Sequence, residues 1–192
     1  MFAQLRVLLH ITRSHLIARR YFVVNGFDGA LTMIGLLVGF AASDSSELKV
    51  VINVCLGAAI ALGVSGVSSA YISEAAEKQR ELRALEKAML ADLGESAYGR
   101  GTRLVPLVIA LVNGSAPLVM SLAIIAPLWA AQASLRLPLA PLHAALAVGL
   151  VVIFLLGVYL GRISGTFWLW AGVRTLLVAA LTAALVVLVT PR

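Results

Sequence analysis

Five long apolar stretches constrain this chain more than any other feature of its sequence. A hydrocarbon core of about 30 Å is crossed by roughly 20 helical residues, and each stretch is long enough to cross it. Only 12% of the residues are charged, whereas soluble domains average about 25%. Because backbone polar groups in lipid must be satisfied within their own segment, each stretch is predicted to be a helix. The stretches are residues 21–42, 50–73, 104–131, 141–160 and 166–189.

These stretches predict an all-α integral membrane protein with five transmembrane helices in one membrane domain, residues 21–192. Residues 1–20 place apolar and basic side chains on opposite sides of a helix, which is typical of an amphipathic helix in the membrane interface. Residues 74–103 are the longest connection, and their first part is predicted to continue the second span as a helix that leaves the membrane. That helix is expected to end at a group of glycines, namely Gly94, Gly99 and Gly101.

The distribution of lysine and arginine predicts the orientation in the membrane. Of the 15 Lys and Arg residues, eleven lie in the connections of one side and three in those of the other. Because Lys and Arg accumulate on the cytoplasmic side, the N-terminus and the helical insert 74–103 are predicted to be cytoplasmic. The same bias accounts for the formal net charge of +6 without a nucleic-acid partner.

Asp28 is the only charged residue within 21–42. A carboxylate inside the bilayer costs at least roughly 2.5–3.5 kcal/mol on insertion scales, so it usually has a partner or a function. Arg174 lies at a similar depth in the fifth span, and an Asp28–Arg174 ion pair is one explanation of both charges. The other explanation is that Asp28 contributes to an ion path.

A cluster of glutamates follows the second span. Glu74, Glu77 and Glu81 are three or four residues apart, so they share a face if this segment is helical. Glu77 and Glu81 repel each other unless a cation such as Lys78 lies between them. A solvated charged face and a peripheral metal-collecting site are both compatible with this pattern.

The third span is interrupted near its middle by proline. Pro117 removes the helical hydrogen bond to the carbonyl of Asn113, next to Gly114 and Ser115. A freed carbonyl in a membrane must be buried in protein or line a polar cavity. Two interpretations are compatible with this pattern: a structural kink, and a carbonyl oxygen that contributes to a permeation path.

Glycines four residues apart occur in the first and fourth spans. They are Gly35 and Gly39 in the first, and Gly157, Gly161 and Gly165 at the end of the fourth. Small residues at this spacing allow helix backbones to approach closely. The pattern is compatible with contacts within the chain and with contacts between subunits.

Three segments occur in an order that a transporter family shares. The first span contains NGFDGALTMIGLLVGF from Asn25, the second contains SGVSSAYISEAAEKQREL from Ser65, and the last contains GVRTLLVAALTAALVVLV from Gly172. In this order, together with five spans and a cytoplasmic insert after the second, they resemble the vacuolar iron transporter family. The chain is similar to a divergent, short member of it, because the insert is reduced to about one helix.

The resemblance implies a multi-pass transporter that exports Fe²⁺ or Mn²⁺ from the cytoplasm in exchange for protons. It implies a homodimer formed through the first span, in a cell inner membrane or a vacuolar-type membrane. The metal ion is then the transported substrate, and no permanently bound cofactor is expected. The lipid bilayer is the other partner.

The resemblance also implies where ions bind. Asp28 corresponds to an ion-path aspartate, whereas the family's methionine and glutamate fall on Gly66 and Ala70 when the second spans are matched at Tyr71. Glu74 follows Ala70 by one turn and is expected to replace the missing carboxylate. Two chains would then supply four carboxylates, which suit Fe²⁺ or Mn²⁺. The candidate metal ligands are therefore Asp28, Glu74, Asn25, Ser69, Glu77 and Glu81.

A non-transporting subunit is the alternative. In that case the chain is a structural or accessory membrane protein with a degenerate ion site, packed in a larger complex. The absence of the family's methionine and glutamate and the reduced insert favour this alternative. An enzyme is not expected, because the sequence has no Ser–His–Asp set, no metal triad and no phosphate-binding glycine loop.

Overall fold

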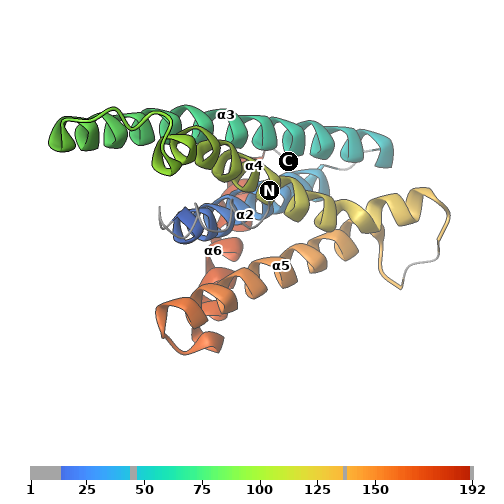
Figure 1. Ribbon diagram of the computed structural model, residues 1–192. Coiled ribbons are helices and arrows are strands. Elements are labelled where there is room, and N and C mark those ends of the chain that lie inside the picture. The colour runs from blue at the N-terminus through green and yellow to red at the C-terminus, as the bar shows by residue number, and fades with distance from the viewer. Residues whose placement is uncertain (1–13, 44–46, 136–137, 191–192) are drawn as a thin grey trace. The chain divides into compact units, whose positions relative to one another are not determined.

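The computed structural model describes residues 14–43, 47–135 and 138–190 (Figure 1). Within these ranges the chain contains no β-strand, and five helices are each long and apolar enough to cross a membrane. The helices are α2 (Ser14–Ala42), α3 (Leu48–Met89), α4 (Ala97–Gln132), α5 (Pro141–Ser164) and α6 (Trp168–Val189). The all-helical class and the five membrane-length helices predicted from the sequence are confirmed.

Helices α2, α3 and α4 each extend by seven or more residues beyond the apolar stretches that predicted them, and α4 does so by beginning at Ala97. α3 continues without a break from the second stretch through residues 74–89, the first part of the predicted insert. α2 begins at Ser14, inside the segment that was predicted to be an interfacial helix. Residues 1–13 of that predicted helix lie outside the described residues.

The described chain divides into two compact units, and each is considered by itself. Unit 1 comprises Met1–Val24, of which residues 14–24 are described, and Gly63–Ser115. Unit 2 comprises Asn25–Leu62 and Ala116–Arg192. Helices α2, α3 and α4 contribute residues to both units, whereas α5 and α6 belong to unit 2.

Unit 2 has an apolar core whose members recur at helical spacing. On α2, Ala30, Met33, Ile34 and Leu37 lie on one face because they are three or four residues apart. Further members are Val51, Ile52 and Cys55 of α3, Ile124, Ile125 and Leu128 of α4, Ala145, Ile153 and Leu156 of α5, and Ala179 of α6. The local apolar periodicity therefore decides which face of each helix is buried.

In unit 2, α2 and α4 touch through their backbones at Gly29 and Pro117. A Cβ atom at Gly29 would lie 2.7 Å from the Cα of Pro117, a distance that real Cβ atoms essentially never show. Gly29 therefore allows α2 to pack directly on α4. Pro117 lies within the continuous helix α4 rather than at a break in it.

Small residues also bring α5 and α6 together in unit 2. A Cβ atom at Gly157 would collide with the side chain of Thr175, and one at Gly161 would collide with that of Ala171. The hydroxyl of Thr175 donates a hydrogen bond to the carbonyl of Ile153 at 3.1 Å. The close packing predicted for Gly157 and Gly161 therefore occurs within the chain.

The end of α3 is formed differently from the prediction. Leu90, immediately after the helix, adopts a left-handed backbone conformation with φ of 50°. Gly99 and Gly101, which were expected to end α3, lie in the first turns of α4. A Cβ atom at Gly99 would collide with the carbonyls of Leu93 and Gly94, so this glycine allows the preceding turn to pack against α4.

Candidate functional site

Unit 1 contains a buried stripe on α3 whose residues change from glycine to charged along the helix. Gly63, Gly66, Ala70, Glu74 and Lys78 are buried and are spaced three or four residues apart, so they form one face. Charged side chains are almost never fully buried unless they are paired. Because Glu74 and Lys78 are only 9% and 5% exposed, this stripe is the candidate functional site.

At its glycine end the stripe packs tightly against α4. A Cβ atom at Gly66 would lie 3.1 Å from the Cα of Gly114. The side-chain amide of Asn113 donates a hydrogen bond to the carbonyl of Gly66 at 2.7 Å. Asn113 is only 4% exposed, and a buried amide requires such a partner. Asn113 therefore joins α4 to α3 through its side chain.

This packing involves Gly66 and Ala70, the two positions that were matched in sequence to ion-path residues of the vacuolar iron transporter family. Gly66 stands at the methionine position, where the close backbone of Gly114 crowds any larger side chain. Ala70 stands at the glutamate position and is 3% exposed. The helix contact in unit 1 thus occurs at Gly66, and Ala70 lies on the same buried face.

Glu74 is held by a tyrosine from the start of α2. The hydroxyl of Tyr21 donates a hydrogen bond to Oε1 of Glu74 at 3.0 Å. Both residues belong to unit 1. Glu74 also follows Ala70 by one turn on the buried face, as the sequence predicted. The arrangement presents a carboxylate in a largely water-free position with one neutral donor, which suits either proton or cation binding.

Lys78 and Glu81 form a salt bridge one turn further along α3. The Nζ of Lys78 lies 2.8 Å from Oε2 of Glu81, and the side chains are 6% and 40% exposed. The hydroxyl of Tyr98 donates to the same oxygen at 3.2 Å. Lys78 is therefore the cation expected among the glutamates, and a metal ion at Glu81 would have to displace it.

Two other predicted ligands of unit 1 point away from the stripe. Glu77 is exposed although it lies three residues from Glu74, because the buried face of α3 continues through Lys78 instead, so the predicted common face of Glu74, Glu77 and Glu81 is not a common buried face. Ser69 is exposed as well, and its hydroxyl is 3.5 Å from the carbonyl of Gly66 in the preceding turn. The structure therefore separates them from the buried carboxylate.

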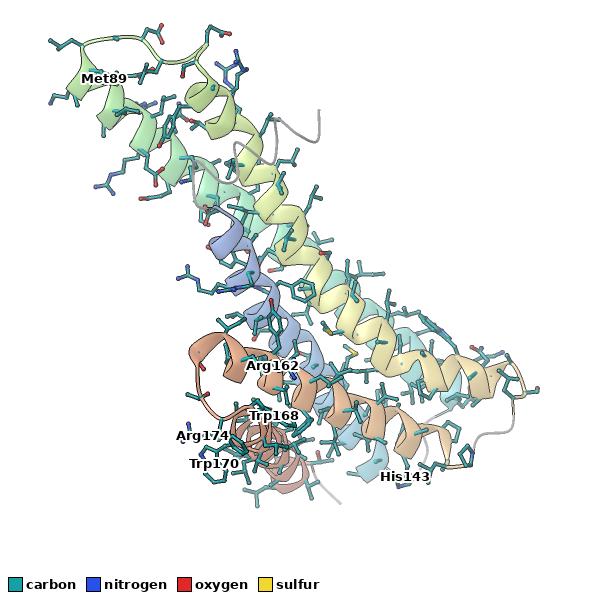
Figure 2. The ribbon with its side chains drawn as sticks, turned by 60° about the horizontal axis from the view of Figure 1, so that its bottom comes forward. Met89, His143, Arg162, Trp168, Trp170 and Arg174 are labelled. Atoms are coloured by element: carbon teal, nitrogen blue, oxygen red, sulfur yellow. The ribbon has the colours of Figure 1, made fainter. Side chains whose placement is uncertain are left out.

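Asp28 and Asn25 lie on α2 within unit 2. Asp28 is exposed, and Asn25 is half-buried. No salt bridge joins Asp28 to Arg174, although the structure describes both residues. The guanidinium of Arg174 instead lies over the ring of Trp170, 5.5 Å from its centroid, and Figure 2 shows the two residues together on α6. The ion pair that the sequence allowed is therefore not formed in this chain.

The predicted ligands do not make up a complete metal site in one chain. Within the described ranges, no three His, Cys, Asp or Glu side chains are close enough together to hold a metal ion. Glu74 is paired with a tyrosine, Glu81 with a lysine, and Asp28 is exposed. The described side chains therefore do not by themselves provide a three-ligand site.

Sequence reasoning did not find the two tyrosines of the site. Tyr21 and Tyr98 are separated from their glutamate partners by 53 and 17 positions. The available signal was that Tyr21 begins the first predicted span, at the level where polar side chains follow the second span, whereas Tyr98 fell in the predicted connection 74–103. Only the packing of α2 and α4 against α3 in unit 1 reveals these contacts.

Comparisons with known proteins identify a relative but no function. The chain is 28% identical over 159 residues to an uncharacterized protein of Methanocaldococcus jannaschii, an alignment that covers 81% of this chain and 79% of the relative. No protein-family model matches the chain. No solved structure matches it either. The similarity extends over most of both proteins, so it concerns the helical domain as a whole.

Proposed function

We propose that this protein is a proton-coupled membrane transporter that exports divalent cations, Fe²⁺ or Mn²⁺, from the cytoplasm. The observation that carries the proposal is the buried carboxylate of Glu74, held by Tyr21 on a helix long enough to cross a membrane. Ionisable groups buried in membrane helices are costly and usually belong to substrate or proton paths. The transporter is multi-pass, in a cell inner membrane or a vacuolar-type membrane.

The proposed working form is a homodimer through the first span. Asp28 is exposed on α2 of a single chain, although a carboxylate facing lipid costs roughly 2.5–3.5 kcal/mol on insertion scales. A second copy of α2 covering this face would remove Asp28 from lipid. Such a dimer contains two copies each of Asp28 and Glu74, and oxygen ligands of this kind suit Fe²⁺ and Mn²⁺.

Proton coupling follows from the chemistry of such carboxylates. A carboxyl group must lose its proton before it binds a metal ion, so a cation and a proton compete for the same oxygen atoms. Cation binding therefore releases protons, and protonation releases the cation. The direction of transport rests on the excess of Lys and Arg in the connections that include residues 74–103, which favours the cytoplasmic side of the membrane for the end of the span that carries Glu74.

One observation favours a second function, that of a non-transporting subunit in a larger membrane complex. Lys78 already neutralises Glu81, and the close contact of Gly66 with Gly114 occupies the place of a family ligand. A chain with these features keeps a helical scaffold while its ion site is incomplete. In this case Asp28 faces a different membrane protein.

Metal uptake into proteoliposomes tests both functions. The purified full-length chain is reconstituted with a divalent-sensitive dye inside the vesicles, and Mn²⁺ is added outside with and without a proton gradient. Wild type is compared with Asp28→Asn and Glu74→Gln. Glu77→Gln is the matched control, because Glu77 is an exposed glutamate on the same helix.

We expect wild type and Glu77→Gln to take up Mn²⁺ and both Asp28→Asn and Glu74→Gln to lose uptake. Absence of uptake of both Mn²⁺ and Fe²⁺ by wild type would overturn the transport function. It would favour the subunit function instead. If Asp28→Asn alone is inactive, Glu74 has no role in the ion path.

A further inference from the structure

The connection between α5 and α6, residues 165–167, is a turn on an exposed surface. Residues 162–170, from the end of α5 to the first turn of α6, are all exposed, and they include the aromatic residues Phe167, Trp168 and Trp170. Gly165 forms the turn in a left-handed conformation with φ of 70°, and its N–H donates to the carbonyl of Gly161. Large aromatic side chains on an ordered, exposed turn require an explanation, because apolar surface is normally buried.

The position of this turn follows from the helices on either side. α5 and α6 are each long and apolar enough to cross a membrane, and they pack directly on each other in unit 2. The turn between two adjacent membrane-crossing helices lies at a membrane surface, whichever side that is. Tryptophan is enriched at this level because its ring is amphipathic.

Arg174 provides a positive charge just below that surface. It is exposed and lies six residues into α6, about 9 Å along the helix axis at 1.5 Å per residue. Its guanidinium lies over the ring of Trp170, one turn nearer the start of α6 (Figure 2). The side chain is therefore directed toward the membrane surface, as long basic side chains in membranes usually are. Among the residues described, none forms a hydrogen bond or salt bridge with Arg174.

The exposed face of α6 that carries Trp170 and Arg174 continues as an apolar strip along the rest of the helix. Its members are three or four residues apart and therefore lie on one face of the helix. They are Trp170, Arg174, Leu177, Leu181, Leu185 and Leu188. Leu177 and Leu181 are 62% and 60% exposed. One helix face thus combines a cation at the surface with a long apolar strip beneath it.

We propose that this exposed face of α6 binds an anionic phospholipid. The guanidinium of Arg174 donates hydrogen bonds to the lipid phosphate, since its planar N–H donors match phosphate oxygens. Trp170 holds the guanidinium at headgroup level. An acyl chain lies along Leu177, Leu181 and Leu185. The lipid site is independent of the proposed transport.

Charge and shape together favour a phospholipid over other occupants. A free phosphate would use Arg174 and leave the apolar strip unoccupied. A zwitterionic lipid such as phosphatidylcholine also carries a phosphate, but its choline cation offsets the attraction to Arg174, so a lipid with net negative charge is favoured. A second copy of this chain could offer its Asp28 to Arg174, and this possibility is an outcome of the test below.

Tryptophan quenching by brominated lipids measures the site directly. The full-length protein carries Trp129→Phe, so that Trp168 and Trp170 are the remaining tryptophans. It is reconstituted in vesicles containing brominated phosphatidylglycerol or brominated phosphatidylcholine. Variants with Arg174→Gln and Arg174→Lys are compared with it. Arg80→Gln is the control, because Arg80 is exposed on α3.

We expect phosphatidylglycerol to associate about fivefold more strongly than phosphatidylcholine, as one basic residue at the membrane surface provides. Arg174→Gln should abolish this preference, whereas Arg174→Lys and Arg80→Gln should retain it. Excess inorganic phosphate should leave the quenching unchanged. Equal quenching by the two lipids, or full competition by phosphate, would overturn the proposal. Loss of the preference in Arg80→Gln would do so too. An increase in the preference for phosphatidylglycerol on introducing Asp28→Asn would also overturn the proposal. It would mean that Arg174 of the wild-type protein is paired with Asp28 of a second copy.

Discussion

The phenol of Tyr21 donates a hydrogen bond to Glu74 across 3.0 Å, although the two residues are 53 positions apart in the sequence. This contact explains how a glutamate is accommodated on the packed face of α3 in unit 1. A buried carboxylate without a donor would be costly, and Tyr21 supplies that donor from another helix. The pair therefore links the stability of unit 1 to its proposed function.

Removal of the tyrosine hydroxyl tests this link. Tyr21→Phe leaves the buried carboxylate of Glu74 with one donor fewer, so the free energy of unfolding should fall by about 1.5 kcal/mol, as for hydrogen bonds to charged groups. Thermal unfolding of the detergent-solubilised protein measures the change. Tyr71→Phe is the control, because Tyr71 is 46% exposed on the same stretch of α3 and should lose almost nothing. Equal melting temperatures for wild type and Tyr21→Phe would show that the hydrogen bond does not stabilise the fold.

Removal of the lysine cation should expose a carboxylate to metal. In Lys78→Met the apolar stem is kept, but Glu81 loses the partner that lies 2.8 Å away. We expect a loss of about 1 kcal/mol of stability rather than the larger value for a fully buried pair, because water reaches Glu81. Isothermal titration with Mn²⁺ should show tighter binding than in wild type, whereas Lys87→Met, at an exposed position, should change neither property. Weaker Mn²⁺ binding by Lys78→Met would mean that Lys78 supports a ligand set rather than competing with it.

Alanine substitutions of glycine distinguish positions that pack against a neighbouring helix from positions on an open helix surface. Gly66→Ala places a methyl group 3.1 Å from the Cα of Gly114, so we expect a loss of about 1–3 kcal/mol from overpacking. Gly57→Ala meets nothing within 4 Å, and it should raise stability by about 0.5–1 kcal/mol because alanine favours the helix. Gly66→Met should destabilise further and should not improve Mn²⁺ uptake. Enhanced uptake by Gly66→Met would contradict the tight contact of α3 with α4.

Disulfide crosslinking tests the homodimer through the first span. Asp28→Cys is introduced together with Cys55→Ser, which removes the native cysteine, and membranes are oxidised before electrophoresis. If two copies of α2 face each other at Asp28, a covalent dimer should form rapidly. Leu181→Cys, exposed on α6, should remain monomeric. Dimers formed only by Leu181→Cys would place the subunit contact on α6 and would argue against the homodimer through α2.

Much of the fold could be predicted because it depends on local patterns. Apolar runs of membrane-crossing length determine the five helices, and the spacing of Met33, Ile34 and Leu37 identifies the buried face of α2. The same spacing argument correctly located Glu74 one turn after Ala70 on a common face. The glycines of α5 predicted close packing but not the partner helix, since a small residue accepts any neighbouring backbone.

The sequence by itself therefore determined a helical membrane protein, the candidate carboxylates and their order along the helices. Only the tertiary structure decided the pairings between helices, namely Glu74 with Tyr21 and Glu81 with Tyr98, whereas Lys78 meets Glu81 and Arg174 meets Trp170 within one turn of a single helix. The physical reason is that helix formation depends on neighbours within one turn. Which side chains meet depends instead on the rotation and depth of each helix against the others, and packing across the whole chain determines both.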